Sequence, residues 1–259
     1  MSRQRHIVHR LSILVTALVL LTVAPAAFAG KDTEEAPFEV ADIFLELNHT
    51  DGDLGLHALI DGDAWRDLEI ESPDEREKLR VTARGSLRRH GLTELFFESA
   101  EPSFDELAPA QFFRRFPEGT WEVSGVTIDG EELESVDELR HVLPAPPSNI
   151  FISGVTAADN CDVEPLPAVS EPVIIEWDPV TTSHPTVGKA GPIEVVKYQL
   201  VVEREEPTLL IFNVDLPPGT TEFEVPEDFT ALGDEFKFEI LVQEASGNRT
   251  AIESCFEID

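Results

Sequence analysis

The chain has 259 residues with 51 Asp and Glu against 19 Lys and Arg, which gives a formal net charge of −32 at pH 7. A surface this acidic repels phosphate backbones, so nucleic acid is excluded as a partner, while cations, basic partners or simple solubility are favoured. Disorder is also disfavoured, because 42% of the residues are hydrophobic and 16 are Phe, enough to build packed cores.

The first 29 residues have the pattern of a secretory signal peptide. Three arginines precede an apolar run at 11–23, and Ala-Phe-Ala at 27–29 places small residues where signal peptidase reads them. The run falls short of the roughly 20 residues that span a bilayer. We therefore expect cleavage before Gly30, export to the periplasm or the extracellular space, and no membrane span in the mature chain. Loss of the three arginines leaves 16 Lys and Arg against 51 Asp and Glu, a net charge near −35.

The remaining chain is long enough for two domains. Residues 30–37 are polar and predict a flexible leader. The stiff Pro-Ala-Pro-Pro stretch at 144–147 predicts a boundary between a first domain, 38–145, and a second domain, 147–259. The predicted fold class is all-β, with two β-sandwich domains in tandem, the first carrying a short helix and the second immunoglobulin-like.

The first domain consists mainly of runs with strand-like alternation. Two Asp-Gly-Asp segments, 51–53 and 61–63, separate the first three runs and predict hairpin turns, because Gly accepts the positive φ that such turns need. The predicted strands are 38–47, 54–61, 64–71, 79–85, 92–99, 119–128 and 137–143.

One segment of the first domain predicts a helix. Ser103 and Glu106 match a capping box, and Pro109 suits a first helical turn. Three phenylalanines would share one face before Pro117 ends the helix, namely Phe112, Phe113 and Phe116. We expect a helix of one or two turns that covers one end of the sandwich.

The second domain resembles a fibronectin type III module. Residues 173–179 (VIIEWDP) match the second strand of that family, and 195–202 (VVKYQLVV) match its third strand. Leu232 stands six residues before Phe238, at the spacing of the family's tyrosine corner, although Phe replaces the corner Tyr. The loop that joins the second and third strands is longer than is typical. The resemblance implies an immunoglobulin-like sandwich with a core that contains Trp177, Tyr198, Leu232 and Phe238.

The two cysteines, Cys161 and Cys255, predict a disulfide, because export would place them in an oxidising compartment. The bond would close a loop of about 94 residues, worth roughly 4 kcal/mol in the chain-entropy description. The fibronectin resemblance is compatible with this pairing, since the first and last strands of such a sandwich can lie close together.

The first domain resembles uncharacterised secreted bacterial proteins, with which it shares strings such as 47–55 (LNHTDGDLG) and 94–99 (ELFFES). This resemblance implies no known activity.

The acidic turns offer one candidate metal site. Asp51, Asp53, Asp61 and Asp63 supply hard oxygen ligands, and two adjacent loops could converge on one calcium ion. The EF-hand pattern is not met, because Gly55 and Gly62 occupy positions that need ligands. The alternative is that both segments are simply polar turns.

No catalytic motif is present in the sequence. The histidines are scattered, and close carboxylate pairs are expected by chance among 51 acids. One basic region stands out in the acidic chain: Lys78, Arg80, Arg84, Arg88, Arg89 and His90. These residues are either outward-facing side chains that pair with nearby acids or a contact site for an acidic partner. Asn48 and Asn248 begin glycosylation sequons, which matter only in a eukaryotic secretory pathway.

The sequence therefore predicts a secreted, non-catalytic binding or structural module with an unidentified protein or polysaccharide ligand. Two alternatives stay open: a calcium-dependent surface or adhesion protein, and a carbohydrate-acting accessory protein or enzyme that uses the acids of the first domain.

Overall fold

Strands dominate residues 36–259, the range that the computed structural model describes, and the all-β prediction is confirmed. The predicted signal peptide and most of the predicted leader lie outside this range. The first half contains β1 (Val40–Asn48), β2 (Asp53–Ser72), β3 (Arg76–Thr82), α1 (Gly85–His90), β4 (Leu92–Glu98), α2 (Pro109–Arg115), β5 (Gly119–Thr127) and β6 (Glu132–Leu139). The second half contains β7 (Ser148–Ile152), β8 (Val155–Thr156), β9 (Ala168–Val169), β10 (Ile174–Asp178), β11 (Val195–Arg204), β12 (Leu210–Leu216), β13 (Glu222–Glu224), α3 (Glu227–Thr230), β14 (Glu235–Glu244) and β15 (Arg249–Ile258).

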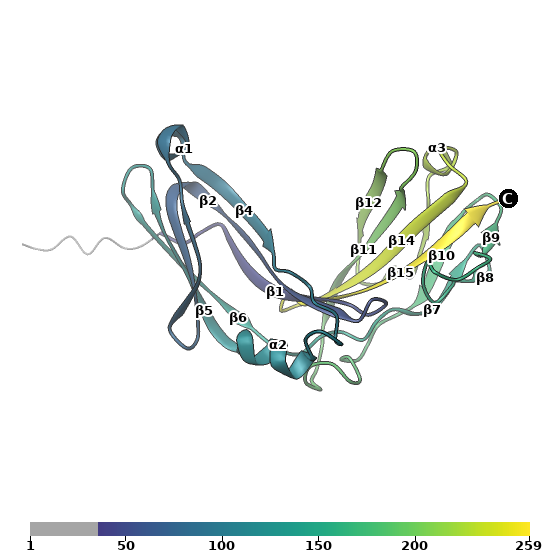
Figure 1. Ribbon diagram of the computed structural model, residues 1–259, viewed down its shortest axis with the longest axis horizontal. Coiled ribbons are helices and arrows are strands. Elements are labelled where there is room, and N and C mark those ends of the chain that lie inside the picture. Colours follow the sequence, from purple (N-terminus) through teal and green to yellow (C-terminus); the bar gives the residue numbers. More distant parts are fainter. Residues whose placement is uncertain (1–35) are drawn as a thin grey trace, which may run out of the picture. The chain divides into compact units, whose positions relative to one another are not determined.

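One 11-stranded sheet runs through both halves. Its main path is β12-β11-β14-β15-β1-β2-β5-β6, with β3 and β4 paired to β2 and β9 paired to β15. The join is the parallel pairing of β1 with β15, visible in Figure 1 where the purple strand meets the yellow one. The first-half strands thus share a sheet with the second half instead of forming two sheets of their own.

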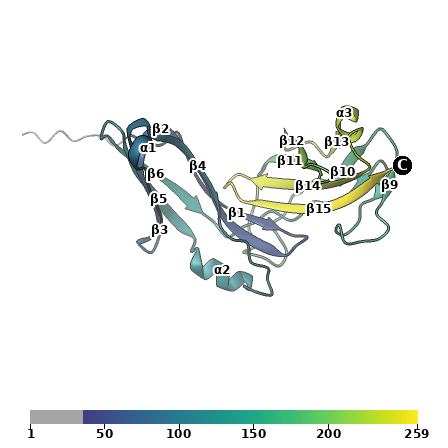
Figure 2. The same cartoon turned by 45° about the horizontal axis from the view of Figure 1, so that its top comes forward.

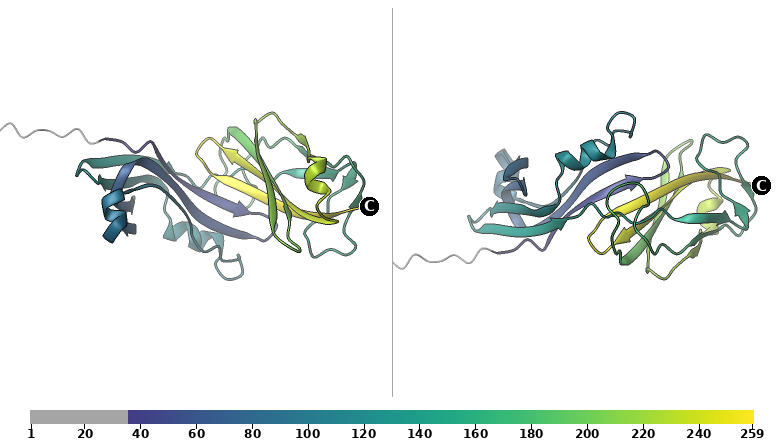
Figure 3. Two further views of the ribbon diagram at one scale, coloured as in Figure 1. Left: turned by 90° about the horizontal axis from the view of Figure 1, so that it is seen from above. Right: turned by 90° about the horizontal axis from the view of Figure 1, so that it is seen from below.

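The second half has the two-layer arrangement of a sandwich. A separate 4-stranded sheet, ordered β13-β10-β7-β8, packs against the end of the large sheet that contains β12, β11, β14 and β15. The shared core includes Trp177, Tyr198 and Phe238, which are 4%, 1% and 0% exposed, as predicted. The ring centroids of Trp177 and Tyr198 are 5.5 Å apart. The ribbon of the second half can be followed from two sides in Figure 3.

Leu232 was predicted for the same core, and this is wrong: its side chain is 47% exposed. Leu232 follows α3 in a turn, where its carbonyl accepts a hydrogen bond of 2.7 Å from the Arg204 guanidinium. Phe229 of α3 fills the neighbouring space instead, because its ring packs 5.8 Å from Phe236 and 5.9 Å from Phe212.

The first half buries its own core against the large sheet. That core contains two completely buried tryptophans, Trp65 and Trp121, together with aliphatic residues of β1, β2 and β5. Leu47 of β1 belongs to this first-half core and pairs with Thr250 of β15. Thr250 lies two residues before Ile252, which belongs to the core of the second half. Since adjacent paired residues share a face, both cores lie on the same face of the sheet.

The second Asp-Gly-Asp segment is not a turn. Residues 54–61 and 64–71 form a single 20-residue strand, β2, with a register irregularity between Asp61 and Trp65. The Phe38 ring packs closely over Gly62, 3.2 Å from where a Cβ would lie. The first segment does form the β1–β2 turn, with Gly52 at φ +67°.

The helix of the first half begins later than the capping box predicted. Ser103 to Leu107 form a turn, and α2 starts at Pro109 after Ala108 at the N-cap. Pro109 occupies the first turn as expected, and Phe112 is buried while Phe113 and Phe116 pack against the same core. The short helix α1 at 85–90 was not predicted.

Residues 36–259 belong to one compact unit, and the predicted domain boundary at 144–147 stays a prediction. Within the described residues, no helix has the length and apolar character needed to cross a membrane.

Tyr198→Phe tests the polar contact of the second core. The Tyr198 hydroxyl accepts a 2.8 Å hydrogen bond from the Val180 amide, and both groups are buried. Phe keeps the ring but leaves that amide without a partner, so we expect the free energy of unfolding to fall by about 1–3 kcal/mol in urea titrations. An unchanged midpoint would mean that water or another group satisfies the amide.

Candidate functional site

Several buried polar side chains lie where the two halves join, among them His184, Asn248 and Thr250. Three residues of β1 pair in parallel with β15, from Glu46 opposite Arg249 to Asn48 opposite Ala251. The β1–β2 turn continues the contact, since the His49 amide donates to the Ala251 carbonyl at 2.8 Å. Two β-strands of separate cores therefore share main-chain hydrogen bonds. Figure 2 labels both strands, β1 and β15.

Asn248 is the centre of this junction. Its side chain is fully buried, its Oδ1 accepts from the Leu45 amide at 2.8 Å, and its Nδ2 donates to the carbonyls of Arg140 and Val142 at 2.7 and 2.9 Å. One amide thus binds β1 and the segment that links the halves. Because the side chain is buried and fully hydrogen-bonded, the sequon at Asn248 is not accessible in the folded protein.

The linking segment is held on its other side by the long loop after β10. Ala145 donates to the Thr182 carbonyl at 2.8 Å, and the amides of His184 and Lys189 donate to the carbonyls of Leu143 and His141 at 2.8 and 2.7 Å. This loop, which is longer than the fibronectin type III pattern predicts, thus packs against the linking segment. Thr250 of β15 adds a hydrogen bond of 2.8 Å to the Pro144 carbonyl.

His49 and His184 form a neutral pair across the junction. His184 Nδ1 accepts from the amides of Thr186 and Val187, at 3.2 and 2.9 Å, so the proton of its neutral ring lies on Nε2. That nitrogen lies 3.2 Å from His49 Nδ1, which must then accept. Burial lowers the pKa of His184 to about 4, with a smaller effect from His49, so both rings remain neutral near pH 7.

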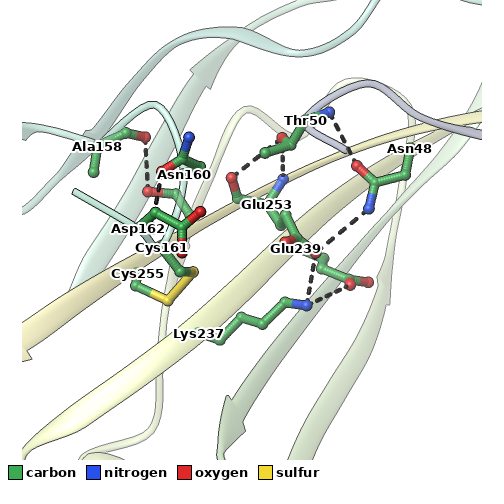
Figure 4. The surroundings of a disulfide bond; sticks show 11 residues. Asn48, Thr50, Ala158, Asn160, Cys161, Asp162, Lys237, Glu239, Glu253 and Cys255 are labelled. Atoms are coloured by element: carbon green, nitrogen blue, oxygen red, sulfur yellow. Dashed lines mark hydrogen bonds and ion pairs between the residues drawn. A yellow bond between two sulfur atoms is a disulfide. The ribbon is translucent and has the colours of Figure 1, made fainter. Parts of the chain in front are cut away.

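A group of partly buried acids lies on the face of the sheet opposite the two cores. Lys237 of β14 contacts Glu253 at 2.6 Å and Glu239 at 3.6 Å, and Asn48 lies 3.4 Å from Glu253 (Figure 4). Burial raises the pKa of Glu239 to about 7, and Lys237 only partly offsets this. Glu46 lies on the same face, 3.5 Å from Arg249, and burial raises its pKa as well.

The predicted calcium ligands do not converge. Asp53 and Asp61 lie eight residues apart along one strand, β2, which corresponds to about 26 Å at roughly 3.3 Å per residue. Asp51 and Asp63 are near their respective Asp neighbours, so the four carboxylates cannot surround one ion. Among residues 36–259, no group of three or more His, Cys, Asp or Glu has a metal-binding arrangement.

Asp53 is nevertheless an unusual acid. Burial raises its pKa to about 6, and the charges of Glu101 and Asp51 act in the same direction. Glu101 contacts His57 Nε2 at 3.0 Å and occupies the space above Gly55, where an added Cβ would overlap its carboxylate. Asp53, His57 and Glu101 therefore form a charged cluster beside β2, but they do not have the geometry of a metal centre.

The predicted disulfide is present between Cys161 and Cys255, with a Cα–Cα distance of 5.0 Å. It joins the loop after β8 to β15, beside the acid group of Figure 4. A polar cavity of about 580 Å³ lies next to it, and its lining includes His49, Thr50, Asn149, Asp159, Asn160 and Glu253.

Two arginines of the basic region, Arg80 and Arg88, pair with acids of β2. Arg80 of β3 contacts Glu69 at 2.5 Å and Glu77 at 2.6 Å, and Arg88 contacts Asp67 at 3.3 Å, so these charges answer neighbouring acids. All six residues of α1 are exposed, including Leu87, which is 54% exposed.

The solved structures that this chain resembles share little sequence identity with it. No protein-family model matches the sequence, and no curated protein matches it. Among solved structures, a tetra-tandem repeat from the extending region of a large adhesion protein aligns with 85% of this chain at 11% identity and a TM-score of 0.27. A structure from a 1.5-MDa bacterial ice-binding adhesin aligns with 87% at 11% identity and a TM-score of 0.24. The alignments cover 50% and 66% of those chains, and scores this low carry no argument about fold or function.

Asn248→Ala tests the centre of the junction. The substitution leaves a buried amide and two buried carbonyls without their partner, so we expect the free energy of unfolding to fall by about 3 kcal/mol or more. Asn213→Ala is the matched control, because Asn213 is exposed on β12 and should change stability by less than about 0.5 kcal/mol. Equal effects of the two substitutions in urea titrations would contradict the role of Asn248.

Glu239→Gln tests the buried acid group through pH. A folded-state pKa of about 7, above the ordinary 4.5, means that the folded protein binds more protons than the unfolded chain between these values, so Glu239 lowers stability as pH rises from 4.5 to 7. Removing the acid should have little effect at pH 4 and should stabilise the protein at pH 8, by at most about 3 kcal/mol. Glu235→Gln, at an exposed position of the same strand, should show no such trend. A stability difference that is independent of pH would overturn this assignment.

Proposed function

We propose that this chain is an exported, non-catalytic structural module that joins two β-domains rigidly, the second of them fibronectin type III-like. The observation that carries the proposal is the continuous sheet. In most tandem arrangements a linker alone connects the domains, and relative motion is the default. Here β1 and β15 exchange main-chain hydrogen bonds between the halves.

The chemistry of the junction supports a structural role. The side-chain amide of Asn248, the hydroxyl of Thr250 and both ring nitrogens of His184 are already hydrogen-bonded within the protein. Groups with their hydrogen-bonding capacity used in this way hold backbone segments in place and are not free to bind a substrate. The polar residues that are best positioned to act together are therefore engaged in connecting the halves.

The fibronectin-like assignment is supported by the layers of the second half. Strands β10, β13 and β7 form one sheet, and β11, β12, β14 and β15 form the facing part of the other, as in a sandwich with Greek-key connections. The buried Trp177 and Tyr198 occupy the strands for which the family pattern predicts them. Export is supported by the disulfide, because such bonds persist in oxidising compartments.

Native-state hydrogen exchange tests the rigid connection. Mass spectrometry at increasing urea concentration would follow amides of β2, in the first core, and of β14, in the second core. If the halves are one mechanical unit, the slowest amides of both strands exchange through the same opening with the same urea dependence.

Asn248→Ala is the informative variant in this experiment. In this variant the slowest amides of β2 and of β14 should exchange through different openings, with different urea dependences. Asn213→Ala is again the control and should leave them coincident. Independent opening of β2 and β14 in the unmodified protein would show that the halves behave as separate domains, and the proposed function would fail.

A further inference from the structure

The long loop between β10 and β11 reaches both cores. We call this loop, residues 179–194, the strap. Near its start, Val180 is buried in the core of the second half, and further along Val187 is buried in the core of the first half. His184 lies between these two anchors and is also buried. One segment of the second half therefore holds on to the first half through a side chain next to a histidine.

The ring of His184 determines how the strap is seated. Its Nδ1 accepts from the amides of Thr186 and Val187, at 3.2 and 2.9 Å, so the residue that enters the first core is bonded to this ring. The ring therefore carries its proton on Nε2, and it cannot change tautomer without losing both amide bonds. The seat of the strap thus depends on an acceptor for the Nε2 proton.

That acceptor is Nδ1 of His49 on the β1–β2 turn, 3.2 Å from His184 Nε2. A proton on His49 Nδ1 would place two N–H donors opposite each other and add a positive charge. His184 is buried, whereas His49 is exposed and lines the polar cavity of about 580 Å³. Protons from solvent therefore reach His49 first, and His49 is the acid-sensitive member of the pair.

The acids around His49 do not pair with it. They lie on its own turn or line the same cavity: Asp51, Asp53, Asp159 and Glu253. Glu253 is already paired with Lys237 at 2.6 Å. Among residues 36–259, the one ion pair between a histidine and an acid joins His57 to Glu101. Burial consequently lowers the pKa of His49, and no carboxylate contact offsets it.

The charged groups at the other end of the strap respond differently to acid. Lys189 of the strap is paired with Glu118, and His141 of the linker contacts the Phe116 carbonyl through Nε2 at 2.7 Å. Burial lowers the pKa of His141 as well. Because Nε2 must donate to this carbonyl in the neutral and in the charged ring, protonation of His141 keeps the bond. The opposed pair of donors is specific to His49 and His184.

We propose that the strap is a pH-sensitive fastener of the junction: when His49 takes up a proton, His184 and the strap separate from the β1–β2 turn, and the connection between the halves loosens. The inference deepens the proposed rigid connection and rests on it.

The direction of the pH effect follows from the two rings. The pKa values of His49 and His184 in the folded protein lie below the ordinary 6.5, so their contribution to stability is present above pH 6.5 and is lost as pH falls. Glu239 acts in the opposite direction, because its pKa is raised to about 7. Global stability combines both effects, so the test needs a local measurement.

Hydrogen exchange of the Thr186 and Val187 amides, followed by NMR at pH 7.5 and 5.0, provides this measurement. Rates are compared with those of an unstructured chain at the same pH, which gives protection factors. We expect protection of both amides to fall by about tenfold or more at pH 5.0, because their acceptor moves away with the His184 ring.

Two variants identify the sensor. His49→Asn keeps an acceptor, the side-chain oxygen, but cannot be protonated, so protection of the strap amides should be the same at both pH values. His90→Asn is the matched control, since His90 is exposed on α1, and it should keep the full response of the unmodified protein. In the unmodified protein, the ring signals of His49 should titrate with the same midpoint as the loss of protection.

Three outcomes would overturn the inference. The first is equal protection of Thr186 and Val187 at both pH values in the unmodified protein. The second is an equal loss of protection in His49→Asn, and the third is a His49 midpoint that differs from that of the strap amides. If β2 and β14 open together at pH 7.5 while the strap ignores pH, the proposed function stands and this inference alone fails. Independent opening of β2 and β14 at pH 7.5 removes the proposed function itself.

Discussion

The parallel pairing of β1 with β15 is the constraint on which the rest of the structure depends, because it makes one sheet out of strands that belong to two cores. Asn248 and Gly247 make this pairing possible. Gly247 has φ +88°, and an added Cβ would lie 3.3 Å from Phe44, so the turn before β15 can approach β1 closely. The linker is suited to the same purpose. Pro144 has no amide hydrogen, so its carbonyl is its one backbone group that needs a hydrogen-bond partner, and the Thr250 hydroxyl donates to it.

A strongly acidic chain must still bury some carboxylates where the halves meet, and the sheet face opposite the cores shows how this is accommodated. Lys237 and Arg249 are placed among Glu46, Glu239 and Glu253, and the Arg249 guanidinium also lies 4.2 Å from the centre of the Phe44 ring. These two cations do not fully offset burial, since the pKa values of Glu46 and Glu239 remain raised. Burial at the junction therefore favours the protonated form of these two carboxyl groups.

Features encoded by local pattern could be predicted, and features encoded by distant contacts could not. The alternation around Trp177 and Tyr198 identifies buried strands, and the pair Cys161 and Cys255 predicts the bond that forms. The Asp-Gly-Asp segment at 61–63 has the local signature of a turn, but Phe38 and the partners of β2 make it part of a strand. Leu232 fails for a similar reason, because Phe229 fills the space that the family pattern assigns to it.

The junction itself was missed for a related reason. Asn248 reads as an ordinary residue at a strand end, and its three hydrogen bonds reach residues about 100 and 200 positions away. The signal that could have located the junction is the extra length of the loop between Trp177 and Tyr198. Family patterns do not require that segment, so its contacts with the linker are a feature of this chain.

The disulfide also determines how far the polypeptide can be extended by a pulling force. Cys161 and Cys255 are separated by 94 positions, and the residues between them include most strands of the second half. When tension is applied between the two ends of the chain, the covalent bond bypasses this enclosed segment. Even when the rest of the chain is fully extended, the segment between the two cysteines, more than a third of the 259 residues, bears no tension until the disulfide is reduced.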